Sequence, residues 1–167
     1  MPIHLFKKLG CENIFITNSS GCLQNNWEIG GFMHISSVID FTFQDSTKPT
    51  KIKFNNSLNY ESIKQFSIYN NIPIYDGSYS WTLGPTYETP SEVLMIKKYG
   101  GDAVGMSTFP EIKTALNIGL NVIGLSCLTN YAAGITNNLL KHEDVVLIAK
   151  KSNVNFCKLI EHIIKTI

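Results

Sequence analysis

The stretch Gly101-Asp102-Ala103-Val104-Gly105-Met106-Ser107-Thr108-Phe109-Pro110-Glu111 contains the transition that decides the fold. The pair Gly100-Gly101 ends a helical pattern, and residues 102–107 then have the length and apolar character of a short buried strand. Residues 108–111 match a capping box with proline in the first turn, which predicts a helix reaching about residue 117. Helix, strand and helix in direct succession indicate an α/β protein.

The same alternation extends in both directions. A helix is predicted to start with Thr89 as N-cap, Pro90 in its first turn and Glu92 completing a capping box, and to end before Gly100. Residues 42–56 are polar and predict an exposed loop. Further helices are expected at 3–9, 57–69 and from 142 onward, and further strands at 13–17, 32–41, 72–83 and 121–128. This order predicts one domain, residues 1–167, with a mainly parallel or mixed central sheet flanked by helices.

Composition limits the function classes. A length of 167 residues suits one core, and 44% hydrophobic with 16% charged residues indicates a folded chain rather than a disordered one. There are fourteen lysines, no arginine and a net charge of +1, so no basic surface for nucleic acid is expected.

The cysteines and the apolar runs indicate the cellular compartment in which the protein is expected. Cys11, Cys22, Cys127 and Cys157 are widely spaced in apolar contexts, which suits small buried thiols in a reducing cytoplasm. No leading apolar segment resembles a signal peptide and no run approaches the ~20 residues that span a bilayer, so neither secretion nor membrane insertion is expected. The four histidines lack metal-ligand spacing, so no metal is expected.

Common catalytic signatures are absent from the sequence. It contains neither a G-x-G-x-x-G nor a G-x-x-x-x-G-K-[ST] phosphate loop, and no G-x-S-x-G nucleophile elbow. Polar clusters instead follow three expected strands, at 18–21, 105–108 and 129–130. Because ligands gather at the carboxyl ends of such strands, these clusters are the candidate site.

Four segments carry a family resemblance. In order, they are Gly84-Pro85-Thr86-Tyr87-Glu88-Thr89-Pro90, then 101–111, then Leu128-Thr129-Asn130, and finally His142-Glu143-Asp144-Val145. In this order and spacing the chain resembles the trimeric purine nucleoside phosphorylases, across nearly its whole length. The resemblance implies a nucleoside phosphorylase-like fold. It also implies phosphorolysis of 6-oxopurine ribo- and deoxyribonucleosides, such as inosine and guanosine, in purine salvage, with inorganic phosphate as co-substrate and no cofactor.

The resemblance assigns catalytic roles at the base. Glu88 corresponds to the family glutamate that accepts protons from the N1 edge of the purine, and an ionised carboxylate is an acceptor only. Asn130 corresponds to the asparagine that faces N7 and the 6-substituent, where an amide suits a 6-oxopurine. Tyr87 would pack on the purine face and Val104 would line its pocket.

The resemblance also assigns ribose and phosphate contacts. Met106 would lie under the ribose, and His142 would reach the 5′-hydroxyl. Ser107 would bind phosphate by its hydroxyl and Ser19 by its backbone N–H, with Asn18 as a further phosphate ligand. Considered one by one, each of these side chains also suits an ordinary structural role, in core packing, at the end of a strand or on the surface.

Phe54 resembles the phenylalanine that a neighbouring subunit lends to the pocket, which implies a homotrimer. In contrast, the family's N-terminal portion, with a Gly- and Ser-rich phosphate loop and an Arg-x-His strand, has no counterpart before Met1. The expectation is therefore an N-terminally truncated fold that corresponds to the C-terminal part of the domain, with half of the phosphate site missing and a sheet edge exposed.

Three readings stay open at this point. The chain is an enzyme segment that works with a separate N-terminal polypeptide, a remnant that binds purine without turnover, or an unstable relic. Hypoxanthine release, calorimetry with purine bases and a melting transition separate them.

Overall fold

The computed structural model describes residues 2–54, 60–136 and 142–166. Its helices are α1 (Pro2–Lys8), α2 (Tyr60–Tyr69), α3 (Pro90–Lys98), α4 (Phe109–Asn117) and α5 (His142–Thr166). Its strands are β1 (Asn13–Cys22), β2 (Phe32–Asp40), β3 (Thr50–Lys53), β4 (Ile74–Trp81), β5 (Ala103–Gly105) and β6 (Asn121–Tyr131). The predicted α/β alternation is confirmed, although the first three residues of the helix expected at 57–69 lie outside the described residues.

The sheet is mixed. Its order is β3-β2-β4-β5-β1-β6, and β6 also pairs with β2, so the pairings from β2 through β4, β5, β1 and β6 return to β2. The β1–β6, β2–β4 and β4–β5 pairs are parallel, whereas β1–β5, β2–β3 and β2–β6 are antiparallel. Of the two sheet types expected, the structure therefore has the mixed one, because β5 and β6 close the ring with reversed partners.

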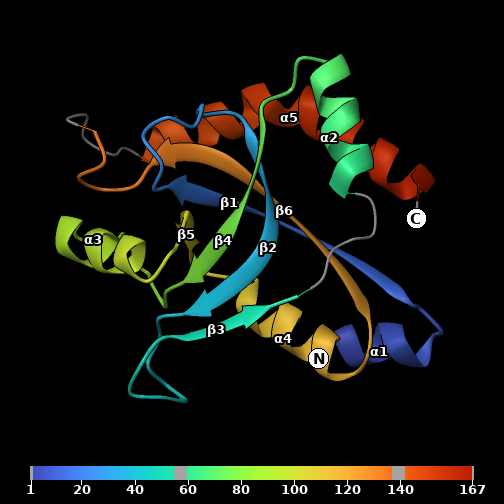
Figure 1. Cartoon of the computed structure of the whole chain (residues 1–167), viewed down its shortest axis with the longest axis horizontal. Coiled ribbons are helices and arrows are strands. Elements are labelled where there is room, and N and C mark those ends of the chain that lie inside the picture. The colour runs from blue at the N-terminus through green and yellow to red at the C-terminus, as the bar shows by residue number, and fades with distance from the viewer. Residues whose placement is uncertain (1, 55–59, 137–141, 167) are drawn as a thin grey trace.

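Helices cover both faces of this sheet (Figure 1). The helices α5 and α2 lie on one face over a core formed by Phe32, Ile63, Leu125 and Leu159, among others. The helices α4 and α1 lie on the other face, and α3 closes one end beside β5. Packing on both faces explains why β2 is buried along almost its whole length.

In the described part of the chain, one edge of β1 has no strand beside it along residues 13–20. Residues 13–20 pair with β6 on one side, whereas β5 joins β1 on the other side only at Gly21 and Cys22. Within the described residues, the backbone groups of the first eight positions of β1 are therefore unpaired along this edge. An edge of this kind is a template for another strand.

Two predicted capping boxes have different outcomes. The Thr89 box is confirmed, since the Thr89 hydroxyl accepts the Glu92 N–H and the Glu92 carboxylate accepts the Thr89 N–H at 2.7 Å. The second box, at residues 108–111, is wrong. Thr108 makes no side-chain cap to α4 and has a φ of 80°, because its hydroxyl bonds to Asn18 instead.

Two further expectations are corrected. The region 42–56 is not all loop, because residues 50–53 form β3 at the outer edge of β2. Cys22 and Cys127 are buried as expected, and burial raises the pKa of the Cys22 thiol to about 11. Cys11 and Cys157, in contrast, are exposed. Among the described helices, none is long and apolar enough to cross a membrane.

His34 is an ionisable group buried in the core. Its side chain is 3% exposed, stacks on Tyr60, and shares a 2.7 Å hydrogen bond between its Nδ1 and Asp76 Oδ1. Its Nε2 is buried and has no hydrogen-bond partner among the described residues. Burial lowers the pKa of His34, and the hydrogen bond to Asp76 only partly offsets this.

We therefore expect stability to fall at acidic pH through His34. Because the pKa in the folded chain lies below the usual value of about 6.5, the unfolded chain binds the proton more tightly. This contribution to the free energy of unfolding is complete above about pH 6.5 and is lost as the pH falls below it. Urea unfolding between pH 8 and 5.5 should show the decline, and His34→Phe should flatten it. If the free energy of unfolding depended on pH in the same way in His34→Phe and in the wild type, this expectation would be contradicted.

Candidate active site

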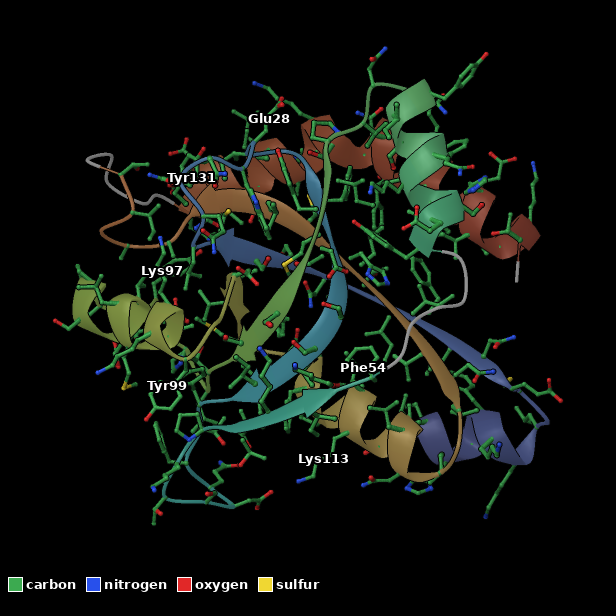
Figure 2. All side chains as sticks on the ribbon, viewed as in Figure 1. Glu28, Phe54, Lys97, Tyr99, Lys113 and Tyr131 are labelled. Atoms are coloured by element: carbon green, nitrogen blue, oxygen red, sulfur yellow. The ribbon has the colours of Figure 1, made fainter. Side chains whose placement is uncertain are left out.

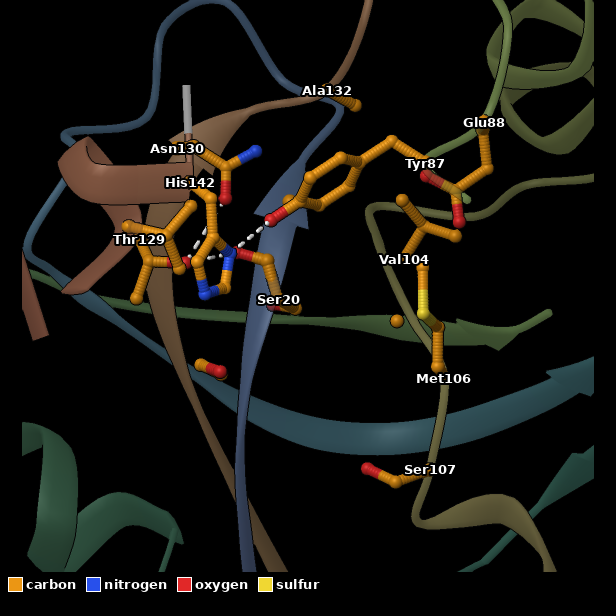
Figure 3. A pocket seen from close by; sticks show the side chains of 14 residues that line it. Ser20, Tyr87, Glu88, Val104, Met106, Ser107, Thr129, Asn130, Ala132 and His142 are labelled. Atoms are coloured by element: carbon orange, nitrogen blue, oxygen red, sulfur yellow. Dashed lines mark hydrogen bonds between the residues drawn. The ribbon is translucent and has the colours of Figure 1, made fainter. Parts of the chain in front are cut away.

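A cleft of about 270 Å³ opens where β1, β5 and β6 end. Five segments line it. They are the β1 end at 19–21, the loop at 87–88, the β5 end at 104–107, the β6 end at 129–132, and the first turn of α5 at 142 and 145. Figure 3 shows the loop and helix side chains facing the strand ends across this space. The three polar clusters predicted at strand ends thus meet in one place.

Glu88 is held by a threonine from its own loop. The Thr82 hydroxyl donates to Glu88 Oε1 at 2.7 Å, and the Thr82 N–H donates to the carbonyl of Gly105 at 3.0 Å. Glu92, not Glu88, caps α3. The Glu88 carboxylate is therefore free of a capping role and is positioned at the cleft as an acceptor.

Tyr87 and His142 meet at the opening of the cleft. The Tyr87 hydroxyl and His142 Nδ1 lie 3.0 Å apart, which joins the loop before α3 to the first residue of α5 (Figure 3). Tyr87 is 43% exposed. An exposed aromatic face at a cleft mouth is suited to stacking on a flat ligand.

Asn130 lies on the opposite wall from Glu88 in Figure 3. Its Oδ1 accepts the Thr129 hydroxyl at 3.0 Å and its Nδ2 donates to the carbonyl of Tyr131 at 3.0 Å. A Cβ at Gly21 would lie 3.2 Å from this Nδ2, so a glycine leaves room for the amide. Asn130 offers both a donor and an acceptor to a ligand that displaces these local bonds.

Ser107 is exposed and lies just after the end of β5. Val104, Met106 and Ser107 all line the cleft. The Ser107 N–H donates to the buried Tyr79 hydroxyl at 3.4 Å. Burial raises the pKa of Tyr79 to about 12, so this phenol keeps its proton at neutral pH. In the described residues no group of three His, Cys, Asp or Glu side chains is placed to hold a metal.

The structure brings most of the predicted site residues together. Eight line the cleft: Ser19, Tyr87, Glu88, Val104, Met106, Ser107, Asn130 and His142. Asn18 is not among the lining residues, because both ends of its amide bond to Thr108 and Ser126. Phe54 packs against the core near α4, well apart from α3 (Figure 2), so a contribution to a neighbouring subunit stays a prediction.

Sequence reasoning missed some contributors. The lining residues Ser20, Gly21, Gly105 and Thr129 belong to the predicted clusters but had no assigned role. The Thr82 contact with Glu88 was not predicted, and nothing in the sequence signals it.

A ring-closed mixed sheet with helices on both faces and a cleft at its strand ends is the architecture that this chain shares with nucleoside phosphorylases. The chain belongs to the phosphorylase superfamily, whose family profile matches residues 1–165. It is 34% identical to purine nucleoside phosphorylase 1 of Bacillus subtilis over 98% of the chain. It is 32% identical to a probable S-methyl-5′-thioinosine phosphorylase of Methanocaldococcus jannaschii over 97% of the chain.

A solved structure agrees in fold. The crystal structure of Schistosoma purine nucleoside phosphorylase in complex with hypoxanthine superposes with a TM-score of 0.83 at 26% identity, covering 99% of this chain and 66% of that one. The chain spans 64% of the Bacillus subtilis relative and 68% of the Methanocaldococcus one. The similarity therefore extends over nearly all of this chain but over only about two thirds of each relative.

Proposed function

We propose that this chain forms the purine-binding part of a purine nucleoside phosphorylase acting on 6-oxopurine nucleosides such as inosine and guanosine. The observation that carries the proposal is the single cleft in which Glu88, Asn130 and Tyr87 face the Met106-Ser107 end of β5. The names of the Bacillus relative and of the hypoxanthine-bound neighbour support the choice of substrate class.

The chemistry at the base follows from these groups. In phosphorolysis, phosphate forms a bond to the anomeric carbon as the bond to the purine nitrogen breaks, and negative charge develops on the departing base. Hydrogen bonds that strengthen as this charge develops lower the barrier. The Asn130 amide can donate to that base, while Glu88 accepts from its N–H edge.

The phosphate end is less complete. Ser107 and Ser19 line the cleft and are the proposed phosphate ligands, but no lysine lines the cleft in the described residues and the sequence has no arginine. We propose that inorganic phosphate is the co-substrate and that polypeptide beyond these 167 residues supplies its cationic ligands. The unpaired edge of β1, which leads directly to Ser19, is a suitable place for such a segment to join the sheet.

The test is hypoxanthine release from inosine by the purified chain, with and without inorganic phosphate. Phosphate-dependent release supports a phosphorylase. No release, even when a polypeptide carrying the remaining third of a relative is added, would overturn the proposal that this chain takes part in catalysis. If the chain binds hypoxanthine but releases none from inosine, either alone or with the added polypeptide, it is a purine-binding protein without turnover.

The bond from Thr82 to Glu88 gives a separate prediction. Thr82→Val keeps the shape of the side chain but removes the donor, and such a bond contributes on the order of 1 kcal/mol. Hypoxanthine affinity should fall about fivefold by calorimetry. Thr86→Val, an exposed change in the same loop, should leave it unchanged. Equal affinities for both variants would contradict the role of Thr82.

We also propose a homotrimer. An exposed apolar patch, defined by Phe43, Leu83, Met95 and Tyr99, lies over the hairpin after β2 and the end of α3, where Figure 2 labels Tyr99. Patches of this kind mark contacts with other chains. In sedimentation, Leu83→Asp should shift a trimer toward monomer, whereas Leu9→Asp, which is exposed outside the patch, should not. A monomeric wild-type chain would contradict the proposal.

A further inference from the structure

A chain of hydrogen bonds runs between two walls of the cleft. Ser20 Oγ and Ser126 Oγ lie 2.6 Å apart, and Ser126 Oγ donates to Asn18 Oδ1 at 2.5 Å. Asn18 Nδ2 donates to Thr108 Oγ1 at 2.8 Å, and Thr108 Oγ1 lies 3.1 Å from Ser107 Oγ. Both end residues, Ser20 and Ser107, line the cleft, while Ser126 and Thr108 are buried.

The amide of Asn18 gives this chain a direction. Each hydroxyl has one proton. Ser126 uses its proton on Asn18 Oδ1, so the Ser20 hydroxyl must be the donor to Ser126. Thr108 already accepts from Asn18, so its own proton is available for Ser107 Oγ. Ser107 then accepts from Thr108, and its proton is left for the cleft.

The surroundings of Thr108 and Ser107 agree with this direction. The Tyr79 oxygen accepts the Ser107 N–H at 3.4 Å, and the Tyr79 hydroxyl stays protonated, as burial raises its pKa to about 12. Because this oxygen already accepts the backbone N–H, Tyr79 does not require the proton of the Ser107 hydroxyl. Thr108 has a φ of 80°, a costly conformation for a β-branched residue, and its bond to Asn18 takes the place of a cap on α4.

We infer that Asn18 is a positioning residue that fixes the donor direction of this chain, so that the Ser107 hydroxyl points its proton at a phosphate oxygen in the cleft. The inference rests on the proposed function for the identity of the anion. It replaces a direct contact between Asn18 and phosphate with an action through Thr108 and Ser107.

Asn18→Asp provides a direct test because it reverses the direction at nearly constant shape. An ionised aspartate only accepts, so it takes the Thr108 proton. To keep its bond to Thr108, Ser107 must then donate to it, and its lone pairs face the anion. The matched control is Asn13→Asp, which makes the same change of charge at an exposed position of the same strand.

Two readouts separate this inference from the proposed function. In the enzyme assay, Asn18→Asp should raise the KM for phosphate about tenfold or more, with the KM for inosine within about twofold. Independently of turnover, titration of the chain with inorganic phosphate should shift the amide resonances of Ser107 and Thr108. That response should be lost in Asn18→Asp and kept in Asn13→Asp.

Charge repulsion alone is excluded by a double-mutant cycle. Thr108→Val cuts the connection, so adding Asn18→Asp to it should cost little more phosphate affinity. A full additional loss in that background would overturn the inference. So would equal phosphate responses of Asn18→Asp and wild type, or no response of Ser107 in wild type. If wild type binds phosphate as described but releases no hypoxanthine, the inference stands and the proposed function fails.

Discussion

Glu88→Gln is expected to lower hypoxanthine affinity by about 10–100-fold, because a charge-assisted hydrogen bond from the purine N–H edge is lost. The glutamine keeps the size of the side chain, and its oxygen can still accept from Thr82. In any preparation that turns over inosine, kcat/KM should fall by a similar factor, because the same bond from the N–H edge holds the base of the nucleoside. Calorimetry measures the first effect and hypoxanthine release the second.

The matched control for this change is Glu92→Gln. It makes the same neutralisation four residues further on, and a glutamine can maintain the capping box with Thr89. Glu92 does not line the cleft. Equal losses in the two variants would mean that Glu88 acts through general charge or loop stability rather than through contact with the base.

Asn130→Asp is expected to shift base preference from hypoxanthine toward adenine. A 6-oxopurine presents two acceptors, O6 and N7, to this side chain, and an aspartate offers no donor to either. Mispaired buried polar groups penalise a ligand strongly, so hypoxanthine affinity should fall by about 100-fold. The 6-amino group of adenine donates to the aspartate, but adenine N1 has no proton for Glu88, so the ratio of hypoxanthine to adenine affinity should fall without adenine gaining the full difference. Competition between the two bases in calorimetry measures the ratio.

Asn121→Asp is the control for this second change. It lies at the exposed start of the same strand, β6, where its side chain donates to Asn13. It should leave the ratio of hypoxanthine to adenine affinity as in wild type. A ratio of hypoxanthine to adenine affinity that is unchanged by Asn130→Asp would contradict the assignment of Asn130 to the 6-position.

Local signals predicted the helices and most strands. The Thr89 box formed as expected because its partners are three residues apart and need no other part of the fold. The same pattern at Thr108 failed because Asn18, ninety residues away, competes for the hydroxyl. The edge strand β3 was missed because its sequence, Thr50-Lys51-Ile52-Lys53, has little apolar character.

The site could be predicted only in part for similar reasons. The carboxyl ends of β1, β5 and β6 signalled the cleft, and eight of the ten predicted residues line it. The bond from Thr82 to Glu88 depends on how the loop folds back, which no periodicity records. Asn18 has the right residue type at the right strand end, but Ser126 and Thr108 occupy its amide.

The most direct test of the central claim is an amide-resolved NMR titration of the chain with hypoxanthine. The account predicts saturable shifts at Glu88, Val104 and Asn130, which come from three separate segments that meet only in this cleft. It also predicts that Glu88→Gln needs about 10–100-fold more hypoxanthine to reach the same shifts. No saturable response, or a response confined to residues outside the cleft, would contradict the assignment of the cleft as a purine site.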